Sequence, residues 1–423
     1  MNGFMDKISE KILPLANALG QNRYLTVLRD AFMLSFPITM FGSIVVVINN
    51  LPFFNDATKG TLSTLFGNGQ NATMSIMTVF VTFGIGYYLS KSYDVEGIFG
   101  GAVSFASFLI LTPFFMTTES GETVTGVLAL DRLGAKGMFI GMIAAFLAGE
   151  IYCRVTKRGW QIKMPDGVPP AVTKSFAALI PAIVTLTIFL ILNAIMTGVF
   201  HANLHDVIYE LIQKPLTGLG SSLPATLLAL FLVQFLWFFG LHGQIIVNSV
   251  MDPIWNTLML DNLEAYQNGE ALPHIVTKPF METFTVGLGG SGMTLAVVIL
   301  MAFVLKKKQY RDVGRLALAP GIFNVNEPAI FGMPIVLNAT ILIPWVVAPL
   351  VVTTFNYLVM AAGLVPAPTG VSVPWTVPVI ASGVLATNSW LGGLLQVIDV
   401  VVVGMIWYPF LRILDRQQEA SIN

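Results

Sequence analysis

Long apolar segments separated by short polar breaks recur along almost the whole of this chain. Because a helix needs about 20 largely apolar residues to cross the hydrocarbon core of a bilayer, such segments indicate transmembrane helices. Charged residues make up 11% of the chain, against about 25% in soluble domains. The sequence therefore predicts an all-α polytopic membrane protein with about ten transmembrane helices, at 28–50, 72–90, 96–116, 135–153, 174–200, 222–240, 242–260, 288–305, 335–363 and 391–413.

Basic residues divide unequally between the two sides of the predicted membrane. Ten crossings place both termini on one side, which then carries 17 of the 22 Lys and Arg residues. Two clusters on that side are RVTKRGWQIK at 154–163 and KKKQYRDVGR at 306–315. Because cytoplasmic loops carry an excess of Lys and Arg, we expect both termini in the cytoplasm.

Composition excludes several kinds of site. A formal net charge of −1 gives no sign of nucleic-acid binding, and the single cysteine, Cys153, excludes an intramolecular disulfide framework. His and Cys residues do not occur at the spacing of metal ligands. We therefore expect neither a metal site nor a cofactor.

The chain divides into three predicted parts. Residues 1–27 place Ile8, Ile12, Leu15 and Leu19 on one helical face, which predicts an amphipathic segment that lies in the membrane interface or packs on the bundle. Residues 28–215 hold plain hydrophobic segments with few intramembrane charges, typical of a transmembrane scaffold. Residues 216–423 hold nearly all the irregular segments.

These irregular segments predict where a ligand binds. Non-helical backbone at membrane depth is tolerated only where protein or a water-filled cavity satisfies its polar groups. Apolar segments interrupted by Gly and Pro therefore point to a binding site near the middle of the membrane. The segments are LHGQ at 241–244, TKPFMETFTVGLGGSG at 277–292, NVNEPAIFG at 324–332 and VPAPTGVSVPWTVP at 365–378.

Glu327 is the residue whose chemistry most needs an explanation. It lies in a broken apolar stretch after the basic cluster, which we interpret as a re-entrant hairpin entering from the cytoplasm. Burying an uncompensated acid costs several kcal/mol, so an intramembrane carboxylate indicates function. Asn324 and Asn326 add donors and acceptors that suit a ligand rich in hydroxyl groups. The alternative is an acid that caps a turn or pairs with Arg315.

Two further ionisable residues lie in irregular segments. His242 is flanked by Gly240 and Gly243, so we expect a helix break that exposes the imidazole to a proton relay or general-base role, or a structural histidine at a helix junction. Glu282 precedes a glycine run that lacks the lysine of a nucleotide-binding loop. That run favours either close approach to a ligand or tight helix packing, and Glu282 can simply pair with Lys278 at i,i+4.

Trp237 and Trp375 are candidates to stack on the apolar face of a sugar, although tryptophan is also the residue of membrane interfaces. Asp399 is another intramembrane acid, which we expect to face the helix bundle.

Three segments together resemble the membrane-embedded IIC component of the bacterial phosphoenolpyruvate-dependent sugar phosphotransferase system, and within it the lactose, cellobiose and diacetylchitobiose permeases. They are GLHGQIIVNSVMDPIW, TKPFMETFTVGLGGSG and NVNEPAIFGMPIVLN. The resemblance implies a homodimer with its interface in the N-terminal domain, 28–215. It implies a C-terminal sugar-binding transport domain, 216–423, with two re-entrant hairpins.

The resemblance also implies roles for residues. Glu327 and His242 would approach the sugar C6 hydroxyl, and either one would act as general base. Asn326, Asn324, Trp237, Trp375 and Glu282 would bind the sugar. A separate cytoplasmic IIB protein, phosphorylated through IIA, would donate the phosphoryl group. This chain would carry no phosphoenzyme intermediate, and it would lie in the bacterial plasma membrane.

Two other functions remain open from residue types alone. In a proton-coupled secondary permease, Glu327 and His242 would titrate and an unmodified sugar would move inward. A passive channel is disfavoured because bulky residues, rather than a continuous polar lining, fill the C-terminal part.

Overall fold

The computed structural model describes residues 14, 18, 21–49, 54–117, 121–333, 335 and 338–417. The chain divides into two compact units. The N-terminal unit comprises Gln21–Gly42 and Gly67–Gly218, and the C-terminal unit includes Ser43–Phe66 and Leu219 onward. The apolar face predicted for residues 1–27 lies outside the described residues.

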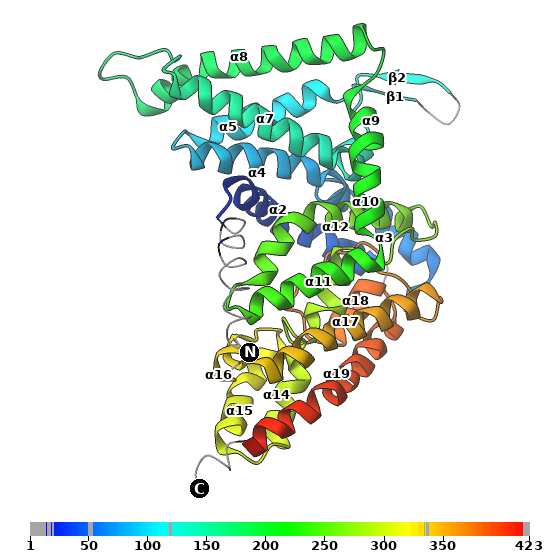
Figure 1. Ribbon diagram of the computed structural model, residues 1–423. Helices are drawn as coiled ribbons and strands as arrows, with labels where there is room; N and C mark the ends of the chain where they lie inside the picture. Colours follow the sequence, from blue (N-terminus) through cyan, green and yellow to red (C-terminus); the bar gives the residue numbers. More distant parts are fainter. Residues whose placement is uncertain are drawn as a thin grey trace. The chain divides into compact units, whose positions relative to one another are not determined.

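Four long helices that pack side by side build most of the N-terminal unit (Figure 1). They are α4 (Met77–Ser92), α5 (Gly97–Leu111), α7 (Met138–Lys157) and α8 (Pro170–Gly198). α2 (Arg23–Asn49) begins in this unit and ends in the other. The short elements of the N-terminal unit are η1 (Met74–Ile76), the antiparallel strands β1 (Phe115–Thr117) and β2 (Thr123–Thr125), α6 (Leu130–Leu133), η2 (Ala135–Gly137), α9 (Leu204–Ile208), η3 (Tyr209–Gln213) and α10 (Lys214–Gly220).

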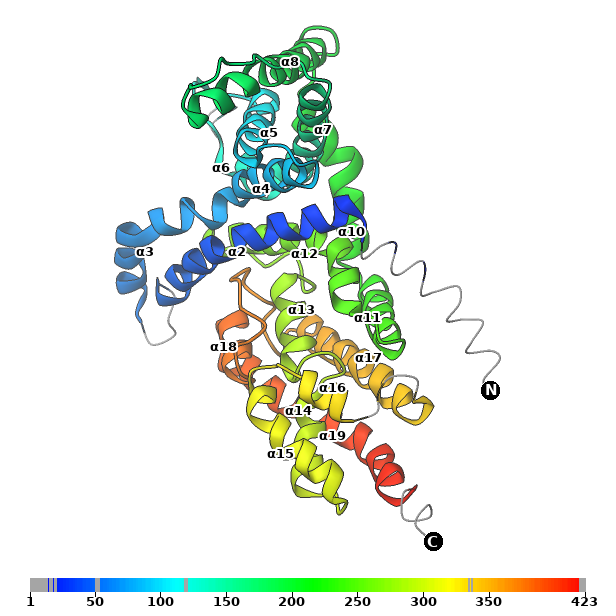
Figure 2. The same ribbon diagram turned by 90° about the vertical axis from the view of Figure 1, so that its left-hand side faces the viewer.

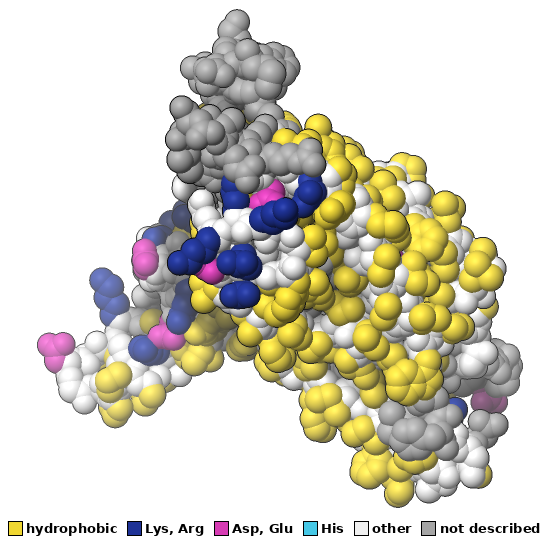
Figure 3. Space-filling model, turned by 90° about the horizontal axis from the view of Figure 1, so that it is seen from below, with side chains coloured by type: hydrophobic (Ala, Val, Ile, Leu, Met, Phe, Trp, Pro, Cys, Tyr) yellow, Lys and Arg dark blue, Asp and Glu magenta, His cyan; other side chains and the backbone are white. Residues whose placement is uncertain are grey.

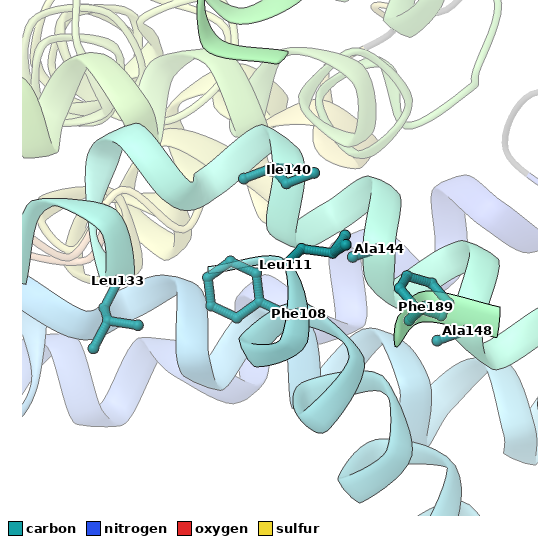
Figure 4. Packing of buried hydrophobic residues seen from close by; sticks show 7 residues of the cluster. All are labelled: Phe108, Leu111, Leu133, Ile140, Ala144, Ala148 and Phe189. Carbon is teal, nitrogen blue, oxygen red and sulfur yellow. The ribbon is translucent and has the colours of Figure 1, made fainter. Parts of the chain in front are cut away.

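A cluster of buried side chains forms the core of the N-terminal unit. Figure 4 shows Phe108 and Leu111 from α5 together with Ile140 and Ala144 from α7 and Phe189 from α8. In contrast, α8 leaves most of its length unburied in the single chain. That apolar surface suits contact with lipid or with another protein chain.

The C-terminal unit is a bundle of helices with several short elements (Figure 2). α17 packs on α11 and α19, and α14 packs on α15 and α19. The helices are α3 (Asp56–Asn71, which crosses the unit boundary), α11 (Leu223–Phe238), α12 (Gly243–Gln267), α13 (Lys278–Phe284), η4 (Val286–Leu288), α14 (Thr294–Phe303), α15 (Lys308–Ile322), α16 (Glu327–Gly332), α17 (Ala339–Ala361), α18 (Ala381–Thr387) and α19 (Trp390–Gln417).

The units differ from the predicted domains in one respect. The chain passes between units at Gly218, close to the predicted boundary at 215, but residues 43–66 group with the C-terminal residues. The reason is local contact: the Ser43 hydroxyl accepts a hydrogen bond from the Ser372 N–H at 2.9 Å. The functions assigned to the two domains stay predictions.

Six helices among the described residues are long and apolar enough to cross a membrane. The number is seven if the helical segments Leu204–Gly220 and Leu223–Phe238, which are bent by 71° at residues 221–222, form one span. The shorter helices α5 and α14 fall in two further predicted spans. The count of ten therefore stays a prediction. The six are Arg23–Asn49, Ala57–Ser92, Ala135–Lys157, Pro170–Gly198, Thr340–Ala361 and Trp390–Asp415.

Basic residues collect where α15 begins and α19 ends. Asp415 accepts the backbone N–H groups of Lys306 and Lys307 at 3.2 and 3.0 Å, and the Lys307 ammonium donates to the Leu414 carbonyl at 3.0 Å. This cation satisfies a carbonyl that the end of α19 leaves open. Figure 3 shows Lys and Arg side chains gathered on one part of a face that is otherwise largely apolar.

Candidate functional site

Two interruptions between helices meet in the C-terminal unit. The first break, residues 285–293, separates α13 from α14, and the second break, residues 323–326, separates α15 from α16. The Gly289 N–H donates to the Asn324 side-chain oxygen at 2.8 Å, and the Asn326 amide donates to the Ser291 carbonyl at 2.7 Å. Two asparagines of one break thus bind the backbone of the other.

Glycine is required at the contact between the breaks. Gly290 has a φ of +81°, and a Cβ there would lie 2.5 Å from the Asn326 side-chain carbon. Left-handed backbone and a contact this close both exclude a larger side chain. The glycine run therefore allows the backbone of the first break to approach the second break closely, and α14 continues from it to pack along α15.

A third segment joins the breaks. The proline-rich loop, residues 362–380, is held by Asn324, whose side-chain amide donates to the carbonyls of Trp375 and Val377 at 2.5 and 3.1 Å. Asn324 itself is 2% exposed, whereas the Trp375 side chain is 42% exposed. The loop thus presents an aromatic side chain beside the second break.

His242 lies at the helix break that the glycines predicted. It is the N-cap of α12, where its Nδ1 accepts the Ile245 N–H at 3.4 Å. The Trp237 ring packs on the imidazole with centroids 4.5 Å apart. Both His242 and Glu327 are exposed.

Glu327 begins α16 directly after Asn326, which places its carboxylate at the positive end of that helix. The structure shows no ion pair between Glu327 and the described Arg315, which was the alternative partner. The side chain of Glu327 is exposed at the second break.

A small cavity lies beside the first break. Polar residues of its lining include Gln244 and Glu282, and the Ser291 hydroxyl donates to the Gln244 oxygen at 2.6 Å. The other polar lining residues are Gln234, Asn248 and Thr285. Among the residues predicted to bind a ligand, Glu282 alone lines this cavity. The volume, about 20 Å³, holds about one water molecule.

Lys278 joins two acids at the cavity wall. Its ammonium lies 2.7 Å from the carboxylates of both Asp252 and Glu282, and all three side chains are less than 20% exposed. The i,i+4 pairing of Lys278 with Glu282 is therefore confirmed, and Asp252 from α12 adds a second acid. This triad, Asp252–Lys278–Glu282, presents carboxylate oxygens that suit hydroxyl groups or other hydrogen-bond donors.

The structure also reveals polar residues that sequence reasoning missed. Gln244, Asn248 and Asp252 follow one another at intervals of four along α12. Such spacing aligns side chains on one helical face, so the stripe was detectable in principle. It was hidden because an isolated Gln or Asn in a helix carries no distinctive signal.

Comparison with known proteins places the chain in a family. A family model described as "Phosphotransferase system, EIIC" matches residues 29–349. The chain belongs to the EIIC family. As an EIIC permease of the phosphotransferase system, it is a multi-pass membrane protein that transports sugar.

Relatives and a solved structure agree with this family. The chain is 60% identical over 97% of its length, and 94% of the relative's, to the "PTS system oligo-beta-mannoside-specific EIIC component" of Bacillus subtilis (strain 168). It is 38% identical, over its full length and 96% of the relative's, to the "PTS system cellobiose-specific EIIC component" of Geobacillus stearothermophilus. The crystal structure of ChbC, the IIC component of an N,N'-diacetylchitobiose-specific system, matches with a TM-score of 0.92 and 38% identity over 98% of each chain.

Proposed function

We propose that this EIIC permease binds a β-linked disaccharide of the cellobiose or diacetylchitobiose class, moves it inward and presents its C6 hydroxyl to phosphorylated IIB. The relatives' names support the sugar class, because cellobiose, diacetylchitobiose and oligo-β-mannosides are all β-linked. The observation that carries the proposal is the meeting of both breaks and the proline-rich loop beside the exposed Glu327. His242 lies two residues before Gln244, which accepts a hydrogen bond from Ser291 of the first break.

The hydrogen bonding of His242 supports a division of roles. We propose that Nδ1, which accepts the Ile245 N–H at 3.4 Å, carries no proton, so that the neutral ring donates from Nε2. An ionised carboxylate only accepts. We therefore assign the general base to Glu327 and the orienting donor to His242.

In the proposed transfer step, the phosphorus–sulfur bond of the IIB phosphocysteine breaks and the cysteine thiolate leaves. A new bond forms between this phosphorus and the oxygen attached to C6 of the sugar. The hydroxyl proton passes to Glu327, and IIA later rephosphorylates IIB. Catalysis of such a transfer rests mainly on positioning and charge stabilisation, so this chain supplies the bound sugar and the base.

Other residues shape or contact the sugar in this proposal. Trp375 stacks on an apolar sugar face, and Trp237 holds the His242 ring. Asn324 and Asn326 fix the breaks, and Glu282 accepts from sugar hydroxyls at the cavity wall.

Sugar entry requires movement. The cavity of about 20 Å³ is far below the roughly 300 Å³ of small ligand pockets. The first break and α12 must separate to admit a disaccharide at Glu282. Such a rearrangement suits a transporter that moves the sugar together with a segment of protein.

The remaining organisation belongs to the same proposal. Residues 28–215 form the scaffold and homodimer interface, residues 216–423 form the transport domain, and the segments at 277–292 and 324–332 re-enter the membrane among about ten crossings. The prediction that the segment 1–27 lies in the membrane interface, in contact with lipid, or packs on the bundle belongs to the proposal as well. Both termini face the bacterial cytoplasm, which the basic cluster around Lys306 supports.

Uptake into vesicles tests this function. Inside-out and right-side-out vesicles receive radiolabelled cellobiose, diacetylchitobiose or mannobiose, with and without phosphorylated IIB. We expect phosphosugar only when phosphorylated IIB is present on the cytoplasmic side. Accumulation of unmodified sugar driven by a pH gradient alone would contradict the proposal and indicate a proton-coupled permease.

A further inference from the structure

Gln396 is a fully buried polar side chain in the apolar helix α19. Its Nε2 donates to the Thr283 carbonyl and to the Ser382 hydroxyl, both at 2.9 Å. Its Oε1 accepts the N–H groups of Ile380 and Gly383, both at 2.8 Å. Every polar atom of this amide is thus used, although Gln396 does not line the cavity beside the first break.

The groups that Gln396 binds belong to two walls of the proposed sugar site. Thr283 follows Glu282 at the end of α13, directly before the first break. Ile380 ends the proline-rich loop, five residues after Trp375. One side chain therefore connects the segment that carries Glu282 to the segment that carries Trp375.

The backbone at Ile380 requires such support. Its φ of +77° is a strained value for a β-branched residue, and it persists only where surrounding contacts hold it. The Gln396 oxygen accepts the N–H of this same residue. Loss of that acceptor allows the end of the loop to relax, which displaces Trp375.

A second contact reinforces the end of α13. The Asn356 amide donates to the Phe284 carbonyl at 3.3 Å and to Asp399 at 2.9 Å, and both residues are 0% exposed. Asp399 follows Gln396 by almost one turn of α19, so Gln396 binds the Thr283 carbonyl directly and Asp399 orients Asn356 of α17, which binds the Phe284 carbonyl. The end of a helix leaves such carbonyls without partners.

We propose that Gln396 is a positioning residue for sugar binding, because its hydrogen bonds to the backbone at Thr283 and Ile380 set the segments that carry Glu282 and Trp375 relative to each other. Asn356 and Asp399 assist at the end of α13. The inference rests on the proposed function, since it assumes that both walls contact the sugar.

Sugar affinity in a double-mutant cycle tests this role. Dissociation constants for cellobiose, diacetylchitobiose and mannobiose are measured calorimetrically on full-length protein in detergent, with unfolding temperatures recorded for each variant. We expect Gln396→Met, which matches the glutamine in size, to weaken binding at least tenfold. We expect the loss of sugar affinity caused by Glu282→Gln to be several-fold smaller in the Gln396→Met background than in the unsubstituted protein, because Gln396→Met has already displaced Glu282.

Matched variants separate positioning from general stability. Gln396→Glu keeps the acceptor for the Ile380 N–H and removes the donor to the Thr283 carbonyl. We therefore expect Trp375 to keep its position, and we expect Glu282→Gln to change the dissociation constant less in this background, as in Gln396→Met. The Gln396→Glu variant decides the question if Gln396→Met does not fold. Thr353→Val removes a buried hydroxyl, for which the described residues offer no hydrogen-bond partner, from the same helix as Asn356, and it leaves affinity unchanged.

Two results are distinguishable. If the unsubstituted protein binds none of the three sugars, the proposed function fails. If it binds and the folded Gln396 variants bind equally well, or if the Glu282→Gln effect is the same in both backgrounds, the positioning role is overturned.

Discussion

Replacing Lys278 by methionine removes the cation that joins two buried acids. An oxygen of each carboxylate lies 2.7 Å from the same nitrogen, so these oxygens of Asp252 and Glu282 are at most about 5.4 Å apart. At an effective dielectric constant of 20, two unit charges at that separation repel by about 3 kcal/mol. Because breaking a buried ion pair costs about 3–5 kcal/mol, we expect Lys278→Met to lower the free energy of unfolding by that amount at neutral pH.

Thermal unfolding of purified protein in detergent measures this effect. Lowering the pH should restore part of the stability of Lys278→Met, because a proton on one carboxylate removes the repulsion. Lys278→Met combined with Asp252→Asn should also restore part of it. Lys214→Met is the matched control: Lys214 pairs with Glu210 at the same i,i+4 spacing, but both side chains are more than half exposed. Such pairs contribute up to about 1 kcal/mol. Equal unfolding temperatures for Lys278→Met and Lys214→Met would refute the reasoning.

Three other changes have expected outcomes. Gly290→Ala places a methyl group 2.5 Å from Asn326 at a φ of +81°, so it should abolish sugar binding. Gly67→Ala, which leaves no atom within 4 Å of the new methyl group, should not affect sugar binding, and calorimetric titration with the sugar checks both variants. Asn324→Ala removes the hydrogen bonds to Gly289, Trp375 and Val377 and should cost roughly 2–4 kcal/mol of stability in thermal unfolding; no loss would contradict the joining role. Trp375→Leu should weaken sugar affinity about tenfold without a change in unfolding temperature, and an unchanged dissociation constant would remove Trp375 from the site.

The local features of the site were predictable because they depend on neighbouring residues. The glycines around His242 predicted its helix break. The pairing of Lys278 with Glu282 followed from helical spacing. Local rules of backbone conformation therefore account for these parts of the fold.

The contacts between distant segments were not predictable in the same way. Lys278 pairs with Asp252 across 26 residues, and Gln396 binds Thr283 across 113 residues. These pairings depend on how helices pack, which no local pattern encodes. Asp399 was expected to face the bundle, and its burial against Asn356 confirms this, but its partner could not be named from sequence.

The role of Glu327 is the central claim, and single-turnover phosphoryl transfer tests it most directly. Purified protein saturated with a sugar that it binds is mixed with phosphorylated IIB, and phosphosugar is quantified over time for the unsubstituted protein, Glu327→Gln and His242→Gln. A general base contributes roughly 10²–10⁴-fold, so we predict a loss of that size in Glu327→Gln with sugar affinity retained, and a smaller loss in His242→Gln. A Glu327→Gln variant that binds sugar and transfers the phosphoryl group at the unsubstituted rate would contradict the account.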